Sequence, residues 1–167
     1  YIIYIIMDKL VNHSNLKNFY LIKPEKSLQK PFILTSAHSG QKTTKYLQNK
    51  IKKNSYNYLS MEDMYVNDIS LKLKNSGCTI LQSNISRIVI DLNRAENEID
   101  PSFILNPPGN IQFHITDKAK FGIGLVPVNN AIGEKIYDNK LLWEDIKYKM
   151  LNYYRPWHLI LKNEIDR

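Results

Sequence analysis

The sequence has little cysteine and no long apolar run, and each shortage excludes a class of protein. Its single cysteine, Cys78, rules out an intrachain disulfide, so nothing indicates an oxidising compartment. Cys78 lies in the apolar run 78–81, which favours a small buried side chain over a nucleophile. The apolar residues 1–7 are far fewer than the ~20 that a membrane span needs, and they lack the basic region and cleavage site of a signal peptide. We therefore expect a cytoplasmic protein with no membrane partner.

Glycine is also scarce, with six among 167 residues, while Lys, Asn, Ile and Tyr are abundant. This bias is typical of an AT-rich coding sequence, and it also explains much of the formal net charge of +7. A nucleic-acid-binding surface needs its cations on one face or along one element, and here they are scattered along the chain. A basic nucleic-acid-binding domain is therefore only a third choice of function, and we expect no nucleic-acid partner.

The rest of the composition is that of a folded domain, with 43% apolar and 23% charged residues. A chain of 167 residues can bury a sizeable core but has little room for a second independent domain. The chain begins with Tyr1, and Met7 is a plausible start. We expect residues 1–12 to be an N-terminal extension of doubtful relevance and residues 13–167 to form a single, incomplete domain.

The apolar pattern predicts alternating strands and helices. Residues 31–37, 78–81 and 85–92 have the apolar, β-branched composition of buried strands. Helices are expected at 41–53 and at 60–77, where Ser60 and Asp63 resemble a capping box and Gly77 supplies a left-handed stop. This order predicts an α/β fold in three layers, with a mainly parallel or mixed central sheet and helices on both faces.

The second half of the chain is less regular. Residues 95–110 contain three prolines and are expected to be a loop, whereas 111–115 and 121–128 are expected to be strands. Residues 138–167 have a helical pattern that Pro156 must bend or break. In the helix expected at 60–77, five residues form an apolar stripe that would face the core: Met61, Met64, Tyr65, Ile69 and Leu73.

The first candidate functional residues follow the first of these strands. His38 comes at its carboxyl end, where catalytic groups of open α/β sheets collect, and a neutral imidazole there can bind zinc. Ser39 and Gly40 would let the backbone turn sharply around a metal. Asp63, or Glu62 as an alternative, could add a carboxylate ligand. The competing interpretations are a histidine that bonds only to a loop and an acid at a helix N-terminus.

The second candidate group lies at residues 86–94. Arginines at both ends of an apolar segment are costly to desolvate without partners. Arg94 with Asn93 could hold a substrate carboxylate, and Arg87 could bind a second carboxylate or a developing oxyanion. The alternative is that Arg87 and Arg94 form structural ion pairs with Asp91 or Glu96.

Five short segments, in this order, resemble the N-formylglutamate amidohydrolase family. They are PFILTSAHSG at 31–40, EDMYVND at 62–68, SRIVIDLNR at 86–94, GIGLV at 122–126 and YRPWH at 154–158. The resemblance runs from about residue 30 to the end, and its strongest part is the segment that contains Asp91, Asn93 and Arg94. Because that family resembles zinc carboxypeptidases and aspartoacylase-like enzymes, the resemblance implies a zinc-exopeptidase-like fold with zinc at the carboxyl edge of its sheet.

The resemblance also implies roles for particular residues. His38 would be the first zinc ligand and Asp63 the second, since Gln41 stands where a carboxypeptidase has its glutamate. Asn93 and Arg94 would bind the α-carboxylate of the substrate, and Arg87 would act on the oxyanion. The implied reaction is zinc-dependent hydrolysis of an N-acyl amino acid, N-formyl-L-glutamate above all, to formate and the amino acid.

Two features of the resemblance stay open. His158 lies in a Tyr-x-Pro-x-His signature, so a catalytic or pocket role competes with that of an ordinary core or surface histidine. The family's Asp-x-His-Ser-Met motif, whose histidine would complete the zinc site, does not occur before Arg167, and the general base would also lie beyond it. We therefore expect a truncated domain with an incomplete zinc site. It is either an inactive remnant or half of an enzyme whose C-terminal half is separately encoded.

Overall fold

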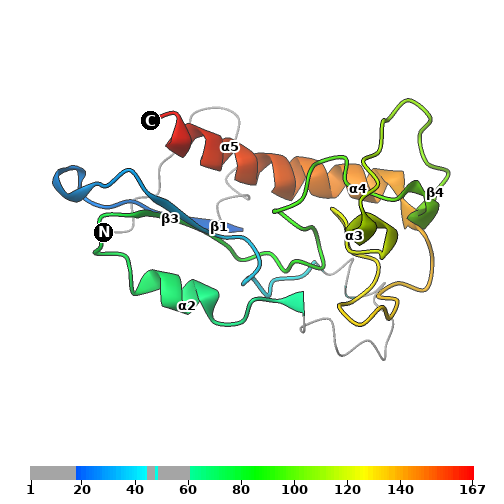
Figure 1. The fold of residues 1–167 in the computed structure, drawn as a ribbon, viewed down its shortest axis with the longest axis horizontal. Coiled ribbons are helices and arrows are strands. Elements are labelled where there is room, and N and C mark those ends of the chain that lie inside the picture. Colours follow the sequence, from blue (N-terminus) through cyan, green and yellow to red (C-terminus); the bar gives the residue numbers. More distant parts are fainter. Residues whose placement is uncertain (1–17, 45–47, 49–60) are drawn as a thin grey trace.

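The structure is a computed structural model that describes residues 18–44, 48 and 61–167 (Figure 1). The N-terminal extension expected at 1–12, most of the helix expected at 41–53 and the capping residue Ser60 lie outside the described residues.

The main sheet has three strands, β1 (Phe19–Ile22), β2 (Ile33–Ser36) and β3 (Thr79–Ser83), with the 3₁₀ turn η1 (Lys26–Leu28) between the first two. β3 lies in the middle, antiparallel to β1 and parallel to β2, and all five of its residues are buried. The strands expected at 31–37 and 78–81 are therefore confirmed. Helices lie on both sides of this sheet, α5 on one and α2 on the other (Figure 1), so the fold is mixed α/β.

A second, smaller sheet pairs β4 (Ile104–Leu105) with β5 (Leu141–Leu142) in parallel. β4 follows the 3₁₀ turn η3 (Pro101–Phe103), so the segment expected to be a loop contains two short elements.

The strands expected at 111–115 and 121–128 are wrong. Residues 111–116 form no regular structure, and the helix α3 (Asp117–Lys120) follows, capped by the Thr116 side chain. At 121–128 the chain turns instead. Gly122 has a φ of 85°, and Gly124 passes so close to Glu98 that a Cβ would lie 2.4 Å from the Glu98 carbonyl oxygen. The glycines that weaken this segment as a strand are required by these turns.

The strand expected at 85–92 is also wrong. Ile85 and Ser86 each make one isolated bridge to the segment after β2, and the chain then passes through the core as a series of turns. Ile88, Val89 and Ile90 are all at most 1% exposed, so they have no alternating inner and outer faces. The amide N–H groups of this segment bond to a carboxylate and to scattered carbonyls instead of to a neighbouring strand.

The C-terminal helical pattern is confirmed, and Pro156 does not break it. The helix α4 (Trp143–Lys149) continues through the π-helical turn η4 (Met150–Tyr154) into α5 (Arg155–Ile165). Pro156 lies in the first turn of α5, directly after the wide turn, where a missing N–H is tolerated. The segment packs onto the core through Trp157, which is 2% exposed and lies 5.4 Å from the Phe19 ring of β1.

The helix expected at 60–77 is shortened to α2 (Val66–Leu71), which begins after Tyr65 in a left-handed conformation. Gly77 does have the left-handed φ expected of a stop, at 88°, but turns separate it from the helix. Asp63 precedes the helix, so the competing interpretation of Asp63 as an acid in the first turn of a helix is wrong.

The orientation of α2 also differs from the expectation. Its inner side is polar, because Asn67 bonds to the Ser83 carbonyl oxygen and Ser70 bonds to the Gln82 side chain. The apolar stripe points outward instead. Met61 alone is buried, whereas Met64, Tyr65, Ile69 and Leu73 are 41%, 69%, 59% and 45% exposed. Polar side chains on the underlying strand attract the polar face of the helix, and the apolar face is left in solvent.

Candidate metal and substrate site

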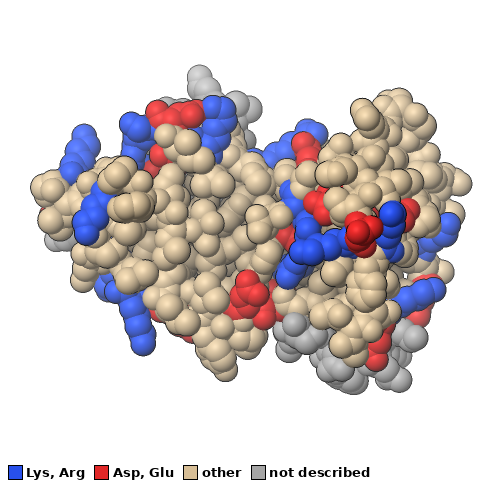
Figure 2. All heavy atoms as spheres, in the orientation of Figure 1, with Lys and Arg blue, Asp and Glu red and all other residues tan. Residues whose placement is uncertain are grey.

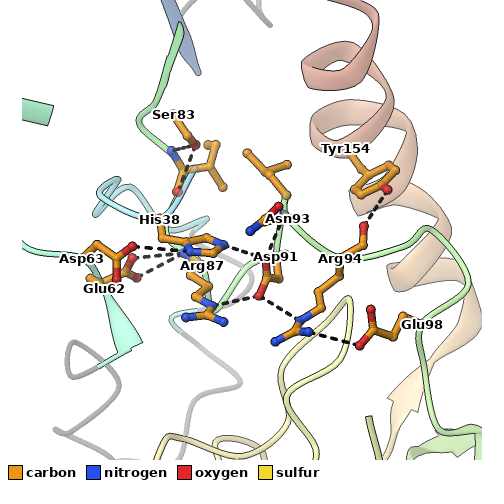
Figure 3. Close-up of polar contacts among 12 residues, drawn as sticks. His38, Glu62, Asp63, Ser83, Arg87, Asp91, Asn93, Arg94, Glu98 and Tyr154 are labelled. Atoms are coloured by element: carbon orange, nitrogen blue, oxygen red, sulfur yellow. Dashed lines mark hydrogen bonds and ion pairs between the residues drawn. The ribbon is translucent and has the colours of Figure 1, made fainter. Parts of the chain in front are cut away.

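The candidate residues come together at the carboxyl end of β2, as expected. His38 follows this strand, Glu62 and Asp63 precede α2, and the turns at 87–94 bring Asp91 beside His38 (Figure 3). Gly40 holds this region close together, because a Cβ there would lie 2.3 Å from the Asn84 carbonyl carbon. Glycine is required at position 40 because the two backbones come this close. Its φ is not in the left-handed region.

His38 lies between two carboxylates (Figure 3). Its Nε2 is 2.7 Å from Asp91 Oδ1, and its Nδ1 is 3.6 Å from Asp63 Oδ2. The Asp63 amide also donates to the His38 carbonyl oxygen, which fixes the two residues relative to each other. When the imidazole is neutral and Nε2 donates to Asp91, the lone pair of Nδ1 faces the Asp63 carboxylate. Two acceptors facing each other suit a bound cation, and a carboxylate behind a ligating histidine is a common support for a metal site.

Asp91 is the centre of a cluster that we call the Asp91 network, made of Asp91, His38, Arg87 and Arg94. Asp91 is 1% exposed, and it accepts from His38, from Arg87 Nε at 2.9 Å and from the Asn93 amide at 2.9 Å. Burial alone would raise the pKa of Asp91, but the His38 hydrogen bond, the nearby charges and the Asn93 amide together hold it below its usual range. The carboxylate therefore stays ionised.

Glu62 bonds to the segment at residues 86 and 87. It accepts from the Ser86 hydroxyl and from the Arg87 amide, the latter at 3.1 Å, and the residue is 7% exposed. Burial raises the pKa of Glu62 to about 7, against the opposing hydrogen bonds from Ser86 and Arg87. Asp63 has 58% of its side chain exposed and faces Nδ1, so it is the carboxylate better placed to share a metal with His38.

Arg87 and Arg94 converge on the same oxygen of Asp91. Arg87 Nε lies 2.9 Å and Arg94 Nε 3.5 Å from Oδ2, and Arg94 also contacts Glu98 Oε1 at 3.3 Å. The alternative of structural ion pairs is therefore confirmed for Asp91. The other expected partner, Glu96, pairs instead with Arg155 at 2.6 Å. Among the described residues the terminal nitrogens of Arg87 have no hydrogen-bond partner, so they remain able to bind an anion.

His158 reaches the site from α5. Its Nε2 lies 3.0 Å from the Leu92 carbonyl oxygen, and its ring lies 4.2 Å from that of Tyr154, whose hydroxyl donates to the Arg94 carbonyl oxygen. A carbonyl only accepts, so Nε2 carries a proton and the neutral ring keeps its lone pair on Nδ1. Burial lowers the pKa of His158. Both side chains thus fix the turn between Asp91 and Arg94.

A cavity of about 220 Å³ joins these groups. His38, Asp63, Asn93 and His158 all line it, and its apolar lining includes Trp157. His38, Asp63, Asn93 and His158, all expected from the sequence, therefore meet around one space. Arg87 and Arg94 do not line it and pair with Asp91 instead.

Asp91 is the important residue that the sequence reasoning did not single out as functional. An acidic residue within the apolar run 88–92 must be paired if it is buried, and that signal could have identified it.

No three His, Cys, Asp or Glu side chains gather as a metal site within the part of the chain that the structure describes. His38 and Asp63 are the two side chains that could donate to a metal here, with Asp91 supporting the imidazole of His38. In the described ranges, no helix combines the length and the apolar character needed to cross a membrane.

The family model for N-formylglutamate amidohydrolase matches residues 30–167. The chain therefore belongs to the N-formylglutamate amidohydrolase family, as the sequence segments indicate.

Two solved structures are similar to it. The N-formylglutamate amidohydrolase of Ralstonia eutropha is 27% identical, with a TM-score of 0.81, covering 89% of this chain and 52% of that one. A gene product of Agrobacterium tumefaciens is 16% identical, with a TM-score of 0.58, covering 95% of this chain and 53% of that one, and it shows the fold alone. The chain thus spans about half the length of either protein. A comparison with curated proteins finds no match.

Proposed function

We propose that the chain supplies part of the active site of a zinc-dependent amidohydrolase that acts on N-acyl amino acids, with N-formyl-L-glutamate as the expected substrate. The proposal is supported most directly by His38, whose Nε2 lies 2.7 Å from Asp91 while its Nδ1 faces Asp63 at 3.6 Å. This is the arrangement of a metal-binding histidine with a carboxylate behind it. Family membership supports the reaction type, and the substrate rests on the family's name.

His38 and Asp63 would hold the zinc, and Asp91 would keep His38 in the tautomer that leaves Nδ1 free to bind. When bound, zinc would supply a Lewis acid and a water molecule of lowered pKa. In the net reaction, water adds its hydroxyl to the formyl carbon and its proton to the amine nitrogen, so the C–N bond breaks and formate and the amino acid leave.

The remaining residues would bind and orient the substrate. Asn93 lines the cavity and would bind the α-carboxylate there. Arg94 and Arg87 lie outside the cavity and pair with Asp91, so they would hold the turn that carries Asn93 and the carboxylate that supports His38. His158 is proposed as a positioning residue, because it bonds to the Leu92 carbonyl oxygen within the turn that carries Asp91 and Asn93.

The first test measures zinc content. Glu62 and Asp63 are neighbours in the sequence, but only Asp63 is expected to bind zinc, so substitutions of the two residues can be compared. We expect the purified chain to take up zinc in equilibrium dialysis, with His38→Ala and Asp63→Asn each lowering uptake at least tenfold. Glu62→Gln is the matched control and should keep the wild-type zinc content. If Glu62→Gln loses zinc while Asp63→Asn keeps it, the assignment of ligands is wrong.

The second candidate function is a metal-binding chain without activity, which is favoured by the presence of only two metal donors among the described residues. Formate release from N-formyl-L-glutamate distinguishes the two. The enzyme proposal expects release that depends on zinc and disappears in His38→Ala. Zinc binding without formate release would support the second candidate. The separately encoded C-terminal half stays a prediction.

A further inference from the structure

The peptide unit that joins Leu92 to Asn93 is held at both of its polar groups. Its N–H donates to Asp91 Oδ1 at 2.9 Å, and its carbonyl oxygen lies 3.0 Å from Nε2 of His158. A peptide unit is planar and stiff, so two hydrogen bonds on its opposite sides fix its orientation. This unit leads directly into the Cα of Asn93, and it therefore sets the direction in which the Asn93 side chain leaves the turn.

Tyr154 holds the turn on the other side of Asn93. Its hydroxyl donates to the Arg94 carbonyl oxygen at 2.6 Å, and its ring lies 4.2 Å from the ring of His158 (Figure 3). Tyr154 and His158 are four residues apart, so their side chains leave the helical segment on one face. We call these two side chains the Tyr154–His158 clamp. Together they bond to the carbonyl groups of the two residues that flank Asn93.

Tyr154 itself stays away from the ligand site. Asn93 and His158 are among the described residues that line the cavity, whereas Tyr154 is not. Tyr154 is 8% exposed, and burial raises the pKa of its hydroxyl, so the group keeps its proton and remains a donor. A change at Tyr154 can therefore reach the cavity only through His158 or through the turn at residues 92–94.

We infer that Tyr154 is a positioning residue, which sets the affinity of the cavity for an α-carboxylate by fixing the Asn93 side chain. The inference rests on the proposed function, in which Asn93 binds that carboxylate. Hydrogen bonds to a charged group are strong, and they weaken steeply when the donor is displaced or turned away. A donor held by the clamp is already in place when the ligand arrives, whereas a donor on a loose turn must first be ordered.

The alternative is that Tyr154 only packs in the core, to which its ring belongs. The hydroxyl would then contribute to overall stability without any particular effect on Asn93. Tyr154→Phe separates the two explanations, because it removes the hydroxyl and keeps the ring that packs against His158. Since one hydrogen bond is lost and no cavity is created, the variant should still fold.

The first experiment measures ligand binding to the chain in a zinc-containing buffer by calorimetric titration. The probe is L-glutamate, the expected product, which carries the α-carboxylate and is not consumed. Tyr154→Phe should raise its dissociation constant about fivefold, as expected for one lost hydrogen bond. Zinc content should change less than about twofold, because His38 and Asp63 keep their contacts.

Tyr148→Phe is the matched control for this measurement. It also removes a tyrosine hydroxyl from the C-terminal helical segment, but Tyr148 is 57% exposed and its ring contacts that of Tyr153. The dissociation constant of L-glutamate should change less than about twofold in this variant. If Tyr148→Phe weakens binding as much as Tyr154→Phe, the inference is overturned.

A double-mutant cycle tests whether Tyr154 acts through Asn93. Asn93→Ala should itself raise the dissociation constant about tenfold, because it removes the amide that binds the carboxylate. In that background Tyr154→Phe should add less than about twofold, since no side chain remains to be positioned. A merely structural role predicts the same factor in both backgrounds, and that result would also overturn the inference.

Hydrogen exchange gives a test that needs no ligand. In Tyr154→Phe the Asn93 amide, which donates to Asp91, should exchange at least about threefold faster. The Asp91 amide donates to the Leu125 carbonyl oxygen at 2.7 Å, outside the clamp, and should keep its rate. Equal acceleration at the two amides would show a loss of overall stability and would contradict a positioning role.

Failure of the proposed function gives a different result. If the wild type binds no L-glutamate, or if Asn93→Ala binds it as well as the wild type, Asn93 is not the carboxylate site. If Tyr154→Phe then still accelerates exchange at Asn93 but not at Asp91, the clamp is supported and the proposed function is not. If exchange at Asn93 is also unchanged, both are wrong.

Discussion

The Asp91 network lies just beyond the carboxyl end of β2, whereas the open edge of β2 and the exposed side of α2, together called the β2–α2 surface, face outward (Figure 2). The two regions differ in how their polar groups are paired. In the network, a carboxylate that is 1% exposed has a partner for each oxygen, all from this chain. On the surface, strand N–H and C=O groups and apolar side chains such as Ile69 have no partner among the described residues. Burial of a charge requires a complete set of partners, whereas an edge or an apolar patch only raises the free energy of the isolated chain. The Asp91 carboxylate therefore has its partners within this chain, whereas the surface exposes groups that have none among the described residues.

The largest effect is expected from breaking the network. Asp91→Ala leaves Arg87 and Arg94 without their shared partner, so the free energy of unfolding should fall by about 3 kcal/mol or more in urea denaturation. Asp117→Asn is the control, because the Asp117 side chain is fully exposed, and its effect should be within ~0.5 kcal/mol. Similar losses in both variants would show that the Asp91 ion pairs contribute little.

The next largest loss of stability is expected at Gly40, where the segment after β2 lies close to the backbone of Asn84. A Cβ at Gly40 would lie 2.3 Å from the Asn84 carbonyl carbon, so Gly40→Ala should lower the free energy of unfolding by ~1–3 kcal/mol. Gly109→Ala has no atom within 4 Å of the new Cβ and should leave stability unchanged or slightly raised. If Gly40→Ala leaves the free energy of unfolding unchanged, the segment after His38 can move away from Asn84 without loss of stability.

The two sides of α2 can be compared directly. Asn67→Ala removes the hydrogen bond that the Asn67 side-chain amide donates to the Ser83 carbonyl oxygen, so it should cost ~1–3 kcal/mol in thermal or urea unfolding. Ile69→Ala, two residues along, should cost less than ~0.5 kcal/mol because the side chain is 59% exposed. The reverse order would mean that the helix packs through its apolar face, as the sequence pattern suggested.

The smallest effect concerns pH. Burial lowers the pKa of His158 from 6.5, so the unfolded chain takes up a proton before the folded one as pH falls through about 6.5. The stability that His158 contributes is therefore fully present above that pH and is lost below it. Urea midpoints at pH 8 and pH 5.5 should differ more for the wild type than for His158→Asn. If the urea midpoints of the wild type and of His158→Asn change equally with pH, residues other than His158 cause the pH dependence.

The sequence predicted the residues around His38 well, because the signals there are local. A proline followed by an apolar run predicted β2, and the position of His38 at its end followed directly. Family segments predicted that Asp63, Asn93 and His158 belong to one site, and the structure brings them to one cavity.

Other features depend on tertiary contacts that no local pattern contains. The run 85–92 has the composition of a strand, but it is buried on all sides and turns, because Glu62 and Leu125 from distant segments accept its amide hydrogens. The apolar stripe of α2 was expected to face inward. Its true orientation depends on Gln82 and Ser83, which present polar groups on a strand that the pattern marks only as buried.

The π-helical turn at Met150–Tyr154 has a consequence for how this chain can vary in length. A wide turn contains one residue more than an α-helical path over the same distance. Deleting one residue there would rotate all of α5 by about 100° relative to α4, since each helical residue turns the chain by that amount. Trp157 would leave the core, and His158 would leave the Leu92 carbonyl oxygen. The spacing between α4 and Pro156 therefore tolerates substitutions but not insertions or deletions, and that single extra residue aligns the C-terminal helix with the turn at Leu92.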